Sequence, residues 1–257
     1  MPKKRNPLTG LYTPALLGGA AATTYIDIVN GVQTANLIAF WPLNETSGTA
    51  AVDQVDSPTQ DGLYSGPTLA QVSDPFGETL IPSFDGVNDF VDNIVNIDSN
   101  FNGAEGSFNI WVLITDAVFK DNTSDMFIRL QVDSNNFIWI RKKNEGGAVR
   151  YDAAYKAGGT QDYTGALGGI AGDVWNMFTI TWSASNDRVR LYDNATLRKT
   201  MTTLGTWAGS LDASNTVLFA GSDVPADLFK GDAAYPAVWN TELDSADITT
   251  LYNGGPV

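Results

Sequence analysis

The sequence predicts an all-β protein built as a two-layered antiparallel β sandwich. From Leu37 onward, short apolar runs alternate with clusters of turn-forming residues, which is typical of a sandwich. Several runs alternate apolar and polar side chains with period two, and only one segment carries strong helix signals. The chain has 257 residues, of which 43% are hydrophobic. A chain of this length buries roughly 75% of its unfolded surface, so it can form a substantial core without disulfides.

Four strands are the best defined. Three have bulky apolar side chains at every second position, and a fourth is apolar on both faces and is expected to be a central strand. Clusters of Asn, Asp and Ser separate them and tolerate the left-handed backbone of hairpin turns. The alternating strands are residues 128–132, 177–182 and 188–192, the central strand is residues 137–140, and the turns are residues 133–136 and 183–187.

The one predicted helix lies near the C-terminus, over about residues 245–252. Asp244 can cap it, Leu243 can pack against Ile248, and Asp247 occupies the third helical position. Asn and Gly residues at 253–255 end it. Paired glycines mark residues 144–173 as a region of long loops.

Residues 1–36 show no sustained strand or helix period, and we expect an extended arm in front of a domain over residues 37–257. An arm of 25 extended residues reaches up to ~80 Å. Pro and Gly interrupt the apolar run of the first 22 residues, so it is a poor signal peptide. Docking on a partner subunit is favoured over folding back on the domain. The docking candidates are Lys3, Lys4, Arg5, Leu11 and Tyr12.

Composition excludes several classes of function. The chain has neither Cys nor His, which removes thiol nucleophiles, thiolate metal sites and imidazole bases. Its net charge is −14, with 29 acidic and 15 basic residues. A chain this acidic repels phosphate backbones, and nucleic-acid binding is therefore not expected. No apolar stretch approaches the ~20 residues that span a bilayer, and no phosphate-binding glycine loop is present.

Five segments stand in a characteristic order: residues 38–48 (IAFWPLNETSG), 83–91 (SFDGVNDFV), 108–112 (FNIWV), 175–197 and 231–255. Together they resemble the laminin G-like jelly-roll domains of the concanavalin A-like lectin/glucanase superfamily. The resemblance covers roughly residues 37–255 and implies two antiparallel sheets in a jelly roll. Pro236 departs from the family's acidic final strand and predicts an edge or a bulge there.

The resemblance also implies which chemistry to look for. Glycosidases of the superfamily carry closely spaced carboxylates on one strand, and the five glutamates here are far apart in sequence. We therefore expect no enzymatic activity and no obligatory cofactor. Calcium is the one cofactor considered, since its ligands are clustered hard oxygens. The candidate ligands are Asp85, Asp89 and Asp92, and the alternative is that they only build turns.

Sugar binding would use exposed aromatic rings in loops, beside hydrogen-bonding groups. The candidates lie in Gly-rich surroundings, and local packing is the alternative for each. The other six tryptophans lie within strand patterns and are expected in the core. The candidates are Tyr151, Tyr155, Tyr163 and Trp207.

Two functions remain open. The first is a non-enzymatic virion structural or decoration protein of the kind found in tailed phages, anchored by its arm to capsid or tail proteins. It would be made in the host cytoplasm without a signal peptide and displayed on the virion surface. The second is a carbohydrate-binding lectin module that recognises host or environmental glycans. Residues 25–29 followed by 38–43 resemble such phage proteins, which favours the first.

Overall fold

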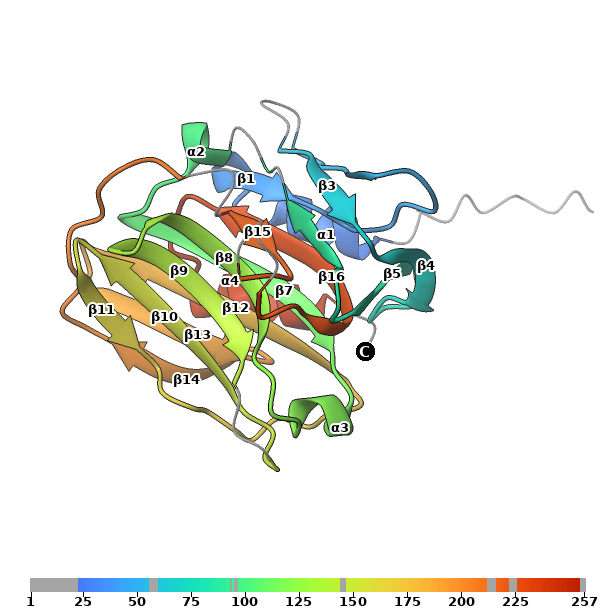
Figure 1. Cartoon of the computed structure of the whole chain (residues 1–257). Helices are drawn as coiled ribbons and strands as arrows, with labels where there is room; N and C mark the ends of the chain where they lie inside the picture. Colours follow the sequence, from blue (N-terminus) through green and yellow to red (C-terminus); the bar gives the residue numbers. More distant parts are fainter. Residues whose placement is uncertain are drawn as a thin grey trace, which may run out of the picture.

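Two antiparallel eight-stranded sheets pack face to face in the computed structural model, which confirms the predicted jelly-roll sandwich (Figure 1). The structure describes residues 23–55, 60–92, 94, 97–143, 147–211, 216–221 and 226–254. Within these ranges, none of the helices is both long and apolar enough to cross a bilayer.

The first sheet, sheet A, runs in the order β14-β13-β12-β7-β16-β5-β4, and β1 also pairs with β16. Consecutive strands in this order pair antiparallel. Its strands are β1 (Leu37–Phe40), β4 (Thr68–Ser73), β5 (Leu80–Asp85), β7 (Glu105–Leu113), β12 (Trp175–Ser183), β13 (Arg188–Asp193), β14 (Thr196–Met201) and β16 (Lys230–Trp239).

The second sheet, sheet B, runs in the order β11-β10-β9-β8-β15-β6-β3-β2. Its strands are β2 (Ala50–Ala51), β3 (Gly62–Ser65), β6 (Phe90–Asp92), β8 (Asp125–Asp133), β9 (Asn136–Lys142), β10 (Tyr151–Ala157), β11 (Thr160–Tyr163) and β15 (Val217–Leu218). The helices are α1 (Tyr25–Gly31), the 3-10 turn η1 (Thr34–Asn36), α2 (Ile97–Asn100), α3 (Asp116–Phe119) and α4 (Ser245–Asn253).

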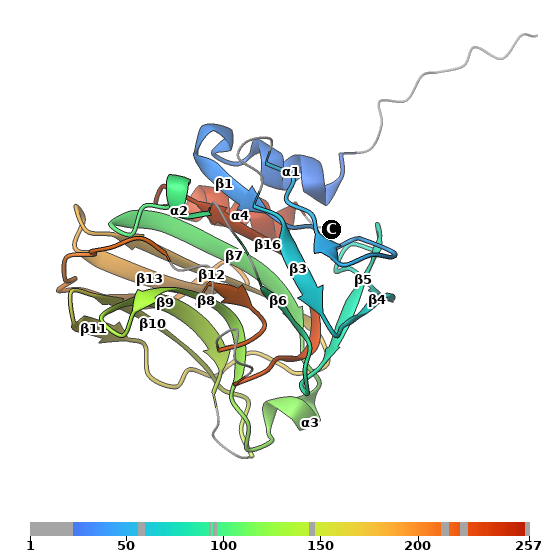
Figure 2. The ribbon, with the colours of Figure 1, turned by 45° about the horizontal axis from the view of Figure 1, so that its top comes forward.

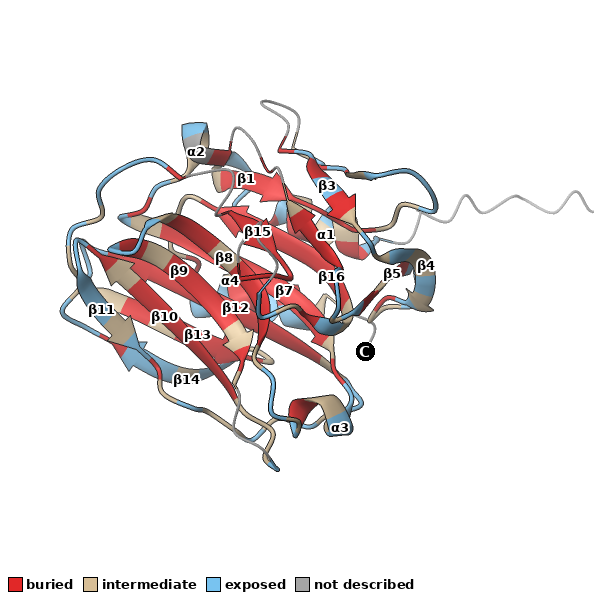
Figure 3. Cartoon of the chain, in the orientation of Figure 1, coloured by how far each residue is buried: buried red, intermediate tan, exposed pale blue. Residues whose placement is uncertain are grey.

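Strand alternation separates two hydrophobic layers. On β7, Phe108, Ile110 and Val112 face the core between the sheets, while Trp111 faces the opposite side of sheet A. The central strands are buried along their length, and the edge strands β4, β11 and β14 are largely exposed (Figure 3). The predicted central strand at residues 137–140 is confirmed, because β9 lies between β8 and β10.

A second layer covers the outer face of sheet A. Helices α1 and α4 lie together on this side of the sandwich, away from β8 to β11 (Figure 2). Beneath them, the Trp239 indole nitrogen donates to the Val32 carbonyl at 2.9 Å and the Trp111 indole nitrogen to the Tyr25 hydroxyl at 2.9 Å. The predicted C-terminal helix is confirmed, with Asp244 accepting from the backbone of Ala246 and Asp247.

Residues 24–36, which the sequence placed in the extended arm, form α1 and η1 instead. Thr24 and Asp27 make a reciprocal capping box, and Tyr25 and Val29, one turn apart, are buried. The capping pair was a readable helix signal that the sequence analysis missed. Residues 1–22, with the docking candidates Lys3, Lys4, Arg5, Leu11 and Tyr12, lie outside the described residues. The arm and the domain division at residue 36 therefore stay predictions.

The expected loop region at 144–173 also contains regular structure. Strands β10 and β11 pair as a hairpin whose turn is Gly158–Gly159, both with positive φ. The strand pattern of β10 is weak in the sequence because several of its buried residues are alanines, which have low strand propensity. The predicted irregularity at Pro236 is confirmed, because the pairing of β16 with β7 slips between Ala234 and Ala237.

Candidate functional site

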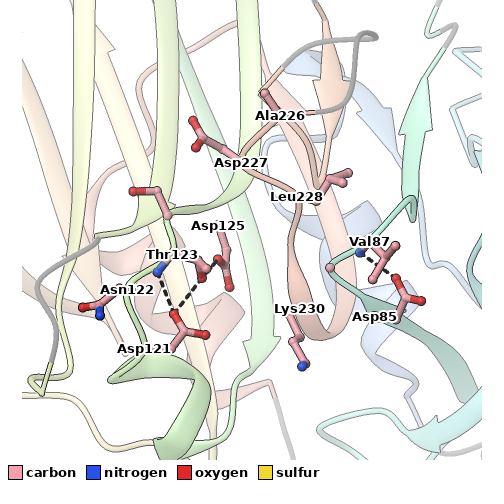
Figure 4. Close-up of a pocket in the computed structure, with 12 residues that line it drawn as sticks. Asp85, Val87, Asp121, Asn122, Thr123, Asp125, Ala226, Asp227, Leu228 and Lys230 are labelled. Carbon is pink, nitrogen blue, oxygen red and sulfur yellow. Dashed lines mark hydrogen bonds between the residues drawn. The ribbon is translucent and has the colours of Figure 1, made fainter.

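Three loops meet at one end of the sandwich and enclose a pocket of about 590 Å³, which we call the end pocket (Figure 4). One loop follows β5, one connects α3 to β8, and one leads into β16. The Met126 backbone nitrogen donates to the Asp227 carbonyl at 2.8 Å, which fixes the third loop to the start of β8. The lining residues are Asp85, Gly86, Val87, Asp121, Asn122, Thr123, Ser124, Asp125, Ala226, Asp227, Leu228 and Lys230.

One wall of the end pocket is held by a buried lysine. The Lys142 ammonium, which is fully buried, lies 2.5 Å from Asp121 Oδ1 and 3.2 Å from Asp125 Oδ1. Thr123 Oγ1 lies 2.6 and 2.7 Å from the same two oxygens. Because this network ties the loop to β9, the wall is a fixed surface and not a loose loop.

The two carboxylates of this wall differ in environment. Burial raises the pKa of Asp125, and hydrogen bonds from Lys142 only partly offset it. Burial also acts to raise the pKa of Asp121, but its hydrogen bonds from Lys142 and Thr123 outweigh it and lower that pKa. Asp125 is 1% exposed, and its Oδ2 atom is buried without a hydrogen-bond partner in the described part of the chain. A ligand in the pocket therefore cannot reach that oxygen.

The opposite wall is the loop after β5. Asp85 and Lys230 are direct partners in the pairing of β5 with β16, so the strand register brings both residues to the pocket lining. The Lys230 stem crosses Gly86, where an added Cβ would lie 2.9 Å from Lys230 Cβ. In Figure 4 the Lys230 side chain extends between the Asp121–Asp125 group and the Asp85–Val87 loop.

The end pocket is lined by polar and apolar groups in about equal measure, and its charged side chains are mostly acidic. Four carboxylates line it, against one lining lysine and the buried Lys142. Hydroxyl and amide groups of Asn122, Thr123 and Ser124 add donors and acceptors. This arrangement can hydrogen-bond a neutral, hydroxyl-rich molecule, and its charge disfavours an anionic one.

Two of the predicted sugar-binding aromatics are wrong, because they lie on β10 and point into the core. Tyr151 and Tyr155 are fully buried. The Tyr151 ring packs 4.8 Å from Phe178 and its hydroxyl donates to Asp193, while the Tyr155 hydroxyl donates to the Gly103 carbonyl at 2.8 Å. Local packing, the alternative considered from sequence, explains both.

The other two candidates do not come together. Tyr163 is 39% exposed and lies on the outer face of sheet B, 6.0 Å from the Trp139 ring. Trp207 is half-buried and packs against Phe101 and Tyr155 beside the inner core. Neither lines the end pocket, so the four aromatics form no common platform. Of the six tryptophans expected in the core, all but the half-buried Trp175 are buried.

The predicted calcium ligands do not form a metal cluster. Asp89 is buried, and its Oδ2 accepts a hydrogen bond from the Asp85 backbone nitrogen at 2.7 Å. Burial raises the pKa of Asp89, which weakens it as a ligand. In the described part of the chain, no three acidic side chains gather as a metal site requires. Asp85, Asp89 and Asp92 do not fit a three-carboxylate calcium site, and turn building accounts for the first two.

The sandwich and its loop-built pocket define a lectin-like jelly-roll domain. A family model described as the concanavalin A-like lectin/glucanases superfamily matches residues 88–249, and the chain belongs to this superfamily. The comparison with curated proteins finds no match.

Solved structures agree with this assignment of the fold. The receptor binding domain of botulinum neurotoxin C/D mosaic serotype has a TM-score of 0.65 at 16% identity, covering 86% of this chain and 51% of that one. The chain thus spans about half the length of that domain. Domain 4 of AbnA, a GH43 extracellular arabinanase from Geobacillus stearothermophilus solved with arabinotriose, has a TM-score of 0.59 at 15% identity, covering 85% of this chain and 98% of that one.

Sequence reasoning found only one side chain of the end pocket, Asp85, and assigned it to calcium. Apart from the adjacent Gly86 and Val87, the lining residues lie more than 30 positions away, within 121–125 and 226–230. The polar run Asp121–Ser124 was a usable signal, since four consecutive polar residues before a buried strand mark an exposed loop at a sheet end.

Proposed function

We propose that this protein is a non-catalytic carbohydrate-binding module and that the end pocket holds a neutral glycan. Membership of the lectin/glucanase superfamily supports this, as does the likeness to a toxin receptor-binding domain and to an arabinanase domain solved with a trisaccharide. The single observation that carries it is the end pocket, in which hydroxyl, amide, carboxylate and ammonium groups from three loops converge on about 590 Å³. Ligand sites typically have volumes of about 300–1,000 Å³.

The environment of Asp121 and Asp125 supports binding without cleavage. Hydrolysis of a glycosidic bond needs two carboxyl groups that reach the bond from opposite sides, about 5–9.5 Å apart. Asp121 and Asp125 share Lys142 and have pKa values shifted apart, which superficially suits an acid and a base. Asp125, however, is shielded from the pocket by Thr123 and Lys142, so this pair serves to hold the loop.

The test is a glycan array of neutral, amino and acidic oligosaccharides, followed by calorimetric titration of the full chain. We expect neutral glycans to bind and uronic or sialic acids to bind weakly. Lys230→Ala and Asn122→Ala should each weaken binding, while Gln161→Ala, an exposed change on β11 far from the pocket lining, should not. Absence of any glycan binding, or pocket variants that bind like the wild type, would contradict the proposal.

We also keep the proposal of display on a virion surface, with capsid or tail proteins as partners. The observation that favours it is the separation of charge, because Lys3, Lys4 and Arg5 precede all 29 acidic residues. Deleting residues 1–22 removes the basic segment and keeps every described residue of the domain, Thr24 and α1 included. Loss of incorporation into particles with unchanged glycan affinity would support anchoring, and normal incorporation would refute it.

A further inference from the structure

A second pocket, of about 510 Å³, lies on the other side of the loop that follows β5; we call it the edge pocket. Asp85 lines both pockets, and the loop 85–89 contributes residues 85–87 to the end pocket and residues 85, 88 and 89 to the edge pocket. The two cavities are therefore neighbours separated by one turn of chain. The edge pocket is lined by Gly66, Thr68, Gln71, Val72, Ser83, Asp85, Asn88 and Asp89.

The loop between the pockets is fixed in shape. The Asp85 backbone nitrogen donates to Asp89 Oδ2 at 2.7 Å, and the Val87 nitrogen donates to Asp85 Oδ1 at 2.7 Å. Gly66, with φ of +85°, packs so closely that an added Cβ would lie 2.3 Å from Asp89 Oδ1. Because the loop is held from within and from the neighbouring turn, the two cavities keep a constant relation to each other.

Val87 stands at the crest of this loop and is 71% exposed, the most of any large apolar side chain in the described residues. Val87 offers an apolar surface at the boundary between the end pocket and the edge pocket. Sugar rings present the same combination, with hydroxyl groups at their rims and C–H groups on their faces. A chain of sugars that crosses Val87 places hydroxyl groups in both pockets.

The edge pocket has the same chemical character as the end pocket. Thr68, Gln71 and Asn88 are exposed and offer both donors and acceptors. Its two carboxylates, Asp85 and Asp89, again disfavour an anionic occupant.

We propose that the two pockets are subsites for one linear neutral oligosaccharide that passes over Val87. The inference rests on the proposed glycan binding and adds that recognition covers several consecutive sugar units. A monosaccharide would fill one subsite only, so affinity would rise with chain length until both subsites are filled and then level off.

The experiment measures binding of the full chain to mono- through hexasaccharide series of α-1,5-arabinan, β-1,4-xylan, β-1,4-glucan, β-1,4-galactan and β-1,4-mannan. We expect one series to bind, with the longer members at least ~10-fold tighter than the monosaccharide, as two or more added hydrogen bonds would give. The double variant Gln71→Ala/Asn88→Ala should remove this gain with length. Val87→Ser should reduce affinity more for the longer members than for the monosaccharide, and Gln161→Ala is the matched control.

The outcomes separate this inference from the proposed function. Binding that does not change with chain length, or a gain that survives Gln71→Ala/Asn88→Ala, overturns the two-subsite proposal and leaves glycan binding in place. Binding by no series overturns both. Thermal melting of each variant checks that folding is intact. We expect melting temperatures near that of the wild type, because all four changed side chains are exposed and only Val87 is apolar.

Discussion

The outer face of sheet A and the end pocket share strands β5 and β16 but are built by opposite means. On the face, α1 and α4 cover large aromatic side chains. Trp239 of β16 and Tyr25 of α1 are fully buried there. At the pocket, β5, β8 and β16 end in loops whose polar side chains remain accessible. The difference indicates that the helix-covered face supplies stability, while the loop-built end is available for recognition.

This difference between the two regions predicts which property each substitution changes. Changes on the covered face should cost folding free energy and spare ligand binding, and changes at the pocket rim should do the reverse. Variants of the two regions therefore test this difference independently, by stability for the covered face and by ligand affinity for the pocket.

The largest expected effect is that of Trp239→Ala. Trp239 is fully buried under α1, and its loss leaves a cavity and removes the hydrogen bond to the Val32 carbonyl. Truncation of a buried Trp typically costs about 3–5 kcal/mol, which urea unfolding would measure. Trp139→Ala is the control: Trp139 is also buried, but on the outer face of sheet B away from α1 and α4, where the Arg141 side chain over its ring can collapse into the space. An equal loss for both tryptophans would refute the importance of the helix cover.

A smaller effect is expected for Tyr25→Phe. The change removes the hydroxyl that accepts from the Trp111 indole nitrogen at 2.9 Å and leaves that buried donor unpaired. Such a loss costs about 1–3 kcal/mol. Tyr252→Phe is the matched control: Tyr252 stacks on the same Trp111 ring but is 36% exposed, and surface changes cost within about 0.5 kcal/mol. A Tyr25→Phe variant as stable as Tyr252→Phe would show that α1 is not held by this contact.

A third prediction compares the interior and the rim within one network. The pKa of Asp125 is raised by burial, so its contribution to stability is complete below its unfolded pKa and is lost as pH rises through the folded value. The pKa of Asp121 is lowered, because hydrogen bonds from Lys142 and Thr123 outweigh burial; its contribution is present above its unfolded pKa and is lost as pH falls through the folded value.

Asp125→Asn and Asp121→Asn should therefore differ in sign when urea unfolding is followed from about pH 3 to pH 8, across the usual carboxylate range near 3.9. Relative to Asp125→Asn, the wild type should lose stability as pH rises. Relative to Asp121→Asn, it should gain stability. Differences that follow the same slope for both variants would show that the two carboxylates share one environment.

The alternating core strands and helix α4 were predictable from sequence, whereas α1 and the end pocket were not. Alternation at residues 177–182 places Phe178, Ile180 and Trp182 on one face whatever the partner strand, because side chains in a strand alternate. The helix at 245–253 follows from a local cap at Asp244. Both signals are contained within a few neighbouring residues.

The end pocket depends on contacts between distant segments. Asp85 and Lys230 meet only because β5 and β16 pair, and no local pattern specifies that pairing. The burial of Tyr151 and Tyr155 was missed for a related reason, since glycines nearby suggested loops while pairing with β9 set the strand. Both the end pocket and the burial of Tyr151 and Tyr155 depend on strand pairing between distant segments, which local sequence patterns do not specify.

The smallest effect on stability is expected at the pocket rim, for Asn122→Ala and Lys230→Ala. Both side chains are exposed, and exposed changes away from caps and buried networks cost within about 0.5 kcal/mol. If the end pocket is the recognition site, these same changes should cause the largest loss of glycan affinity, each removing a ligand hydrogen bond. Titration and urea unfolding of the two variants should therefore rank them opposite to Trp239→Ala, which should bind normally wherever it is folded. A Lys230→Ala variant that loses stability like Tyr25→Phe would instead place Lys230 in the fold's support, because its stem then would be needed to hold Gly86 and the loop beneath it.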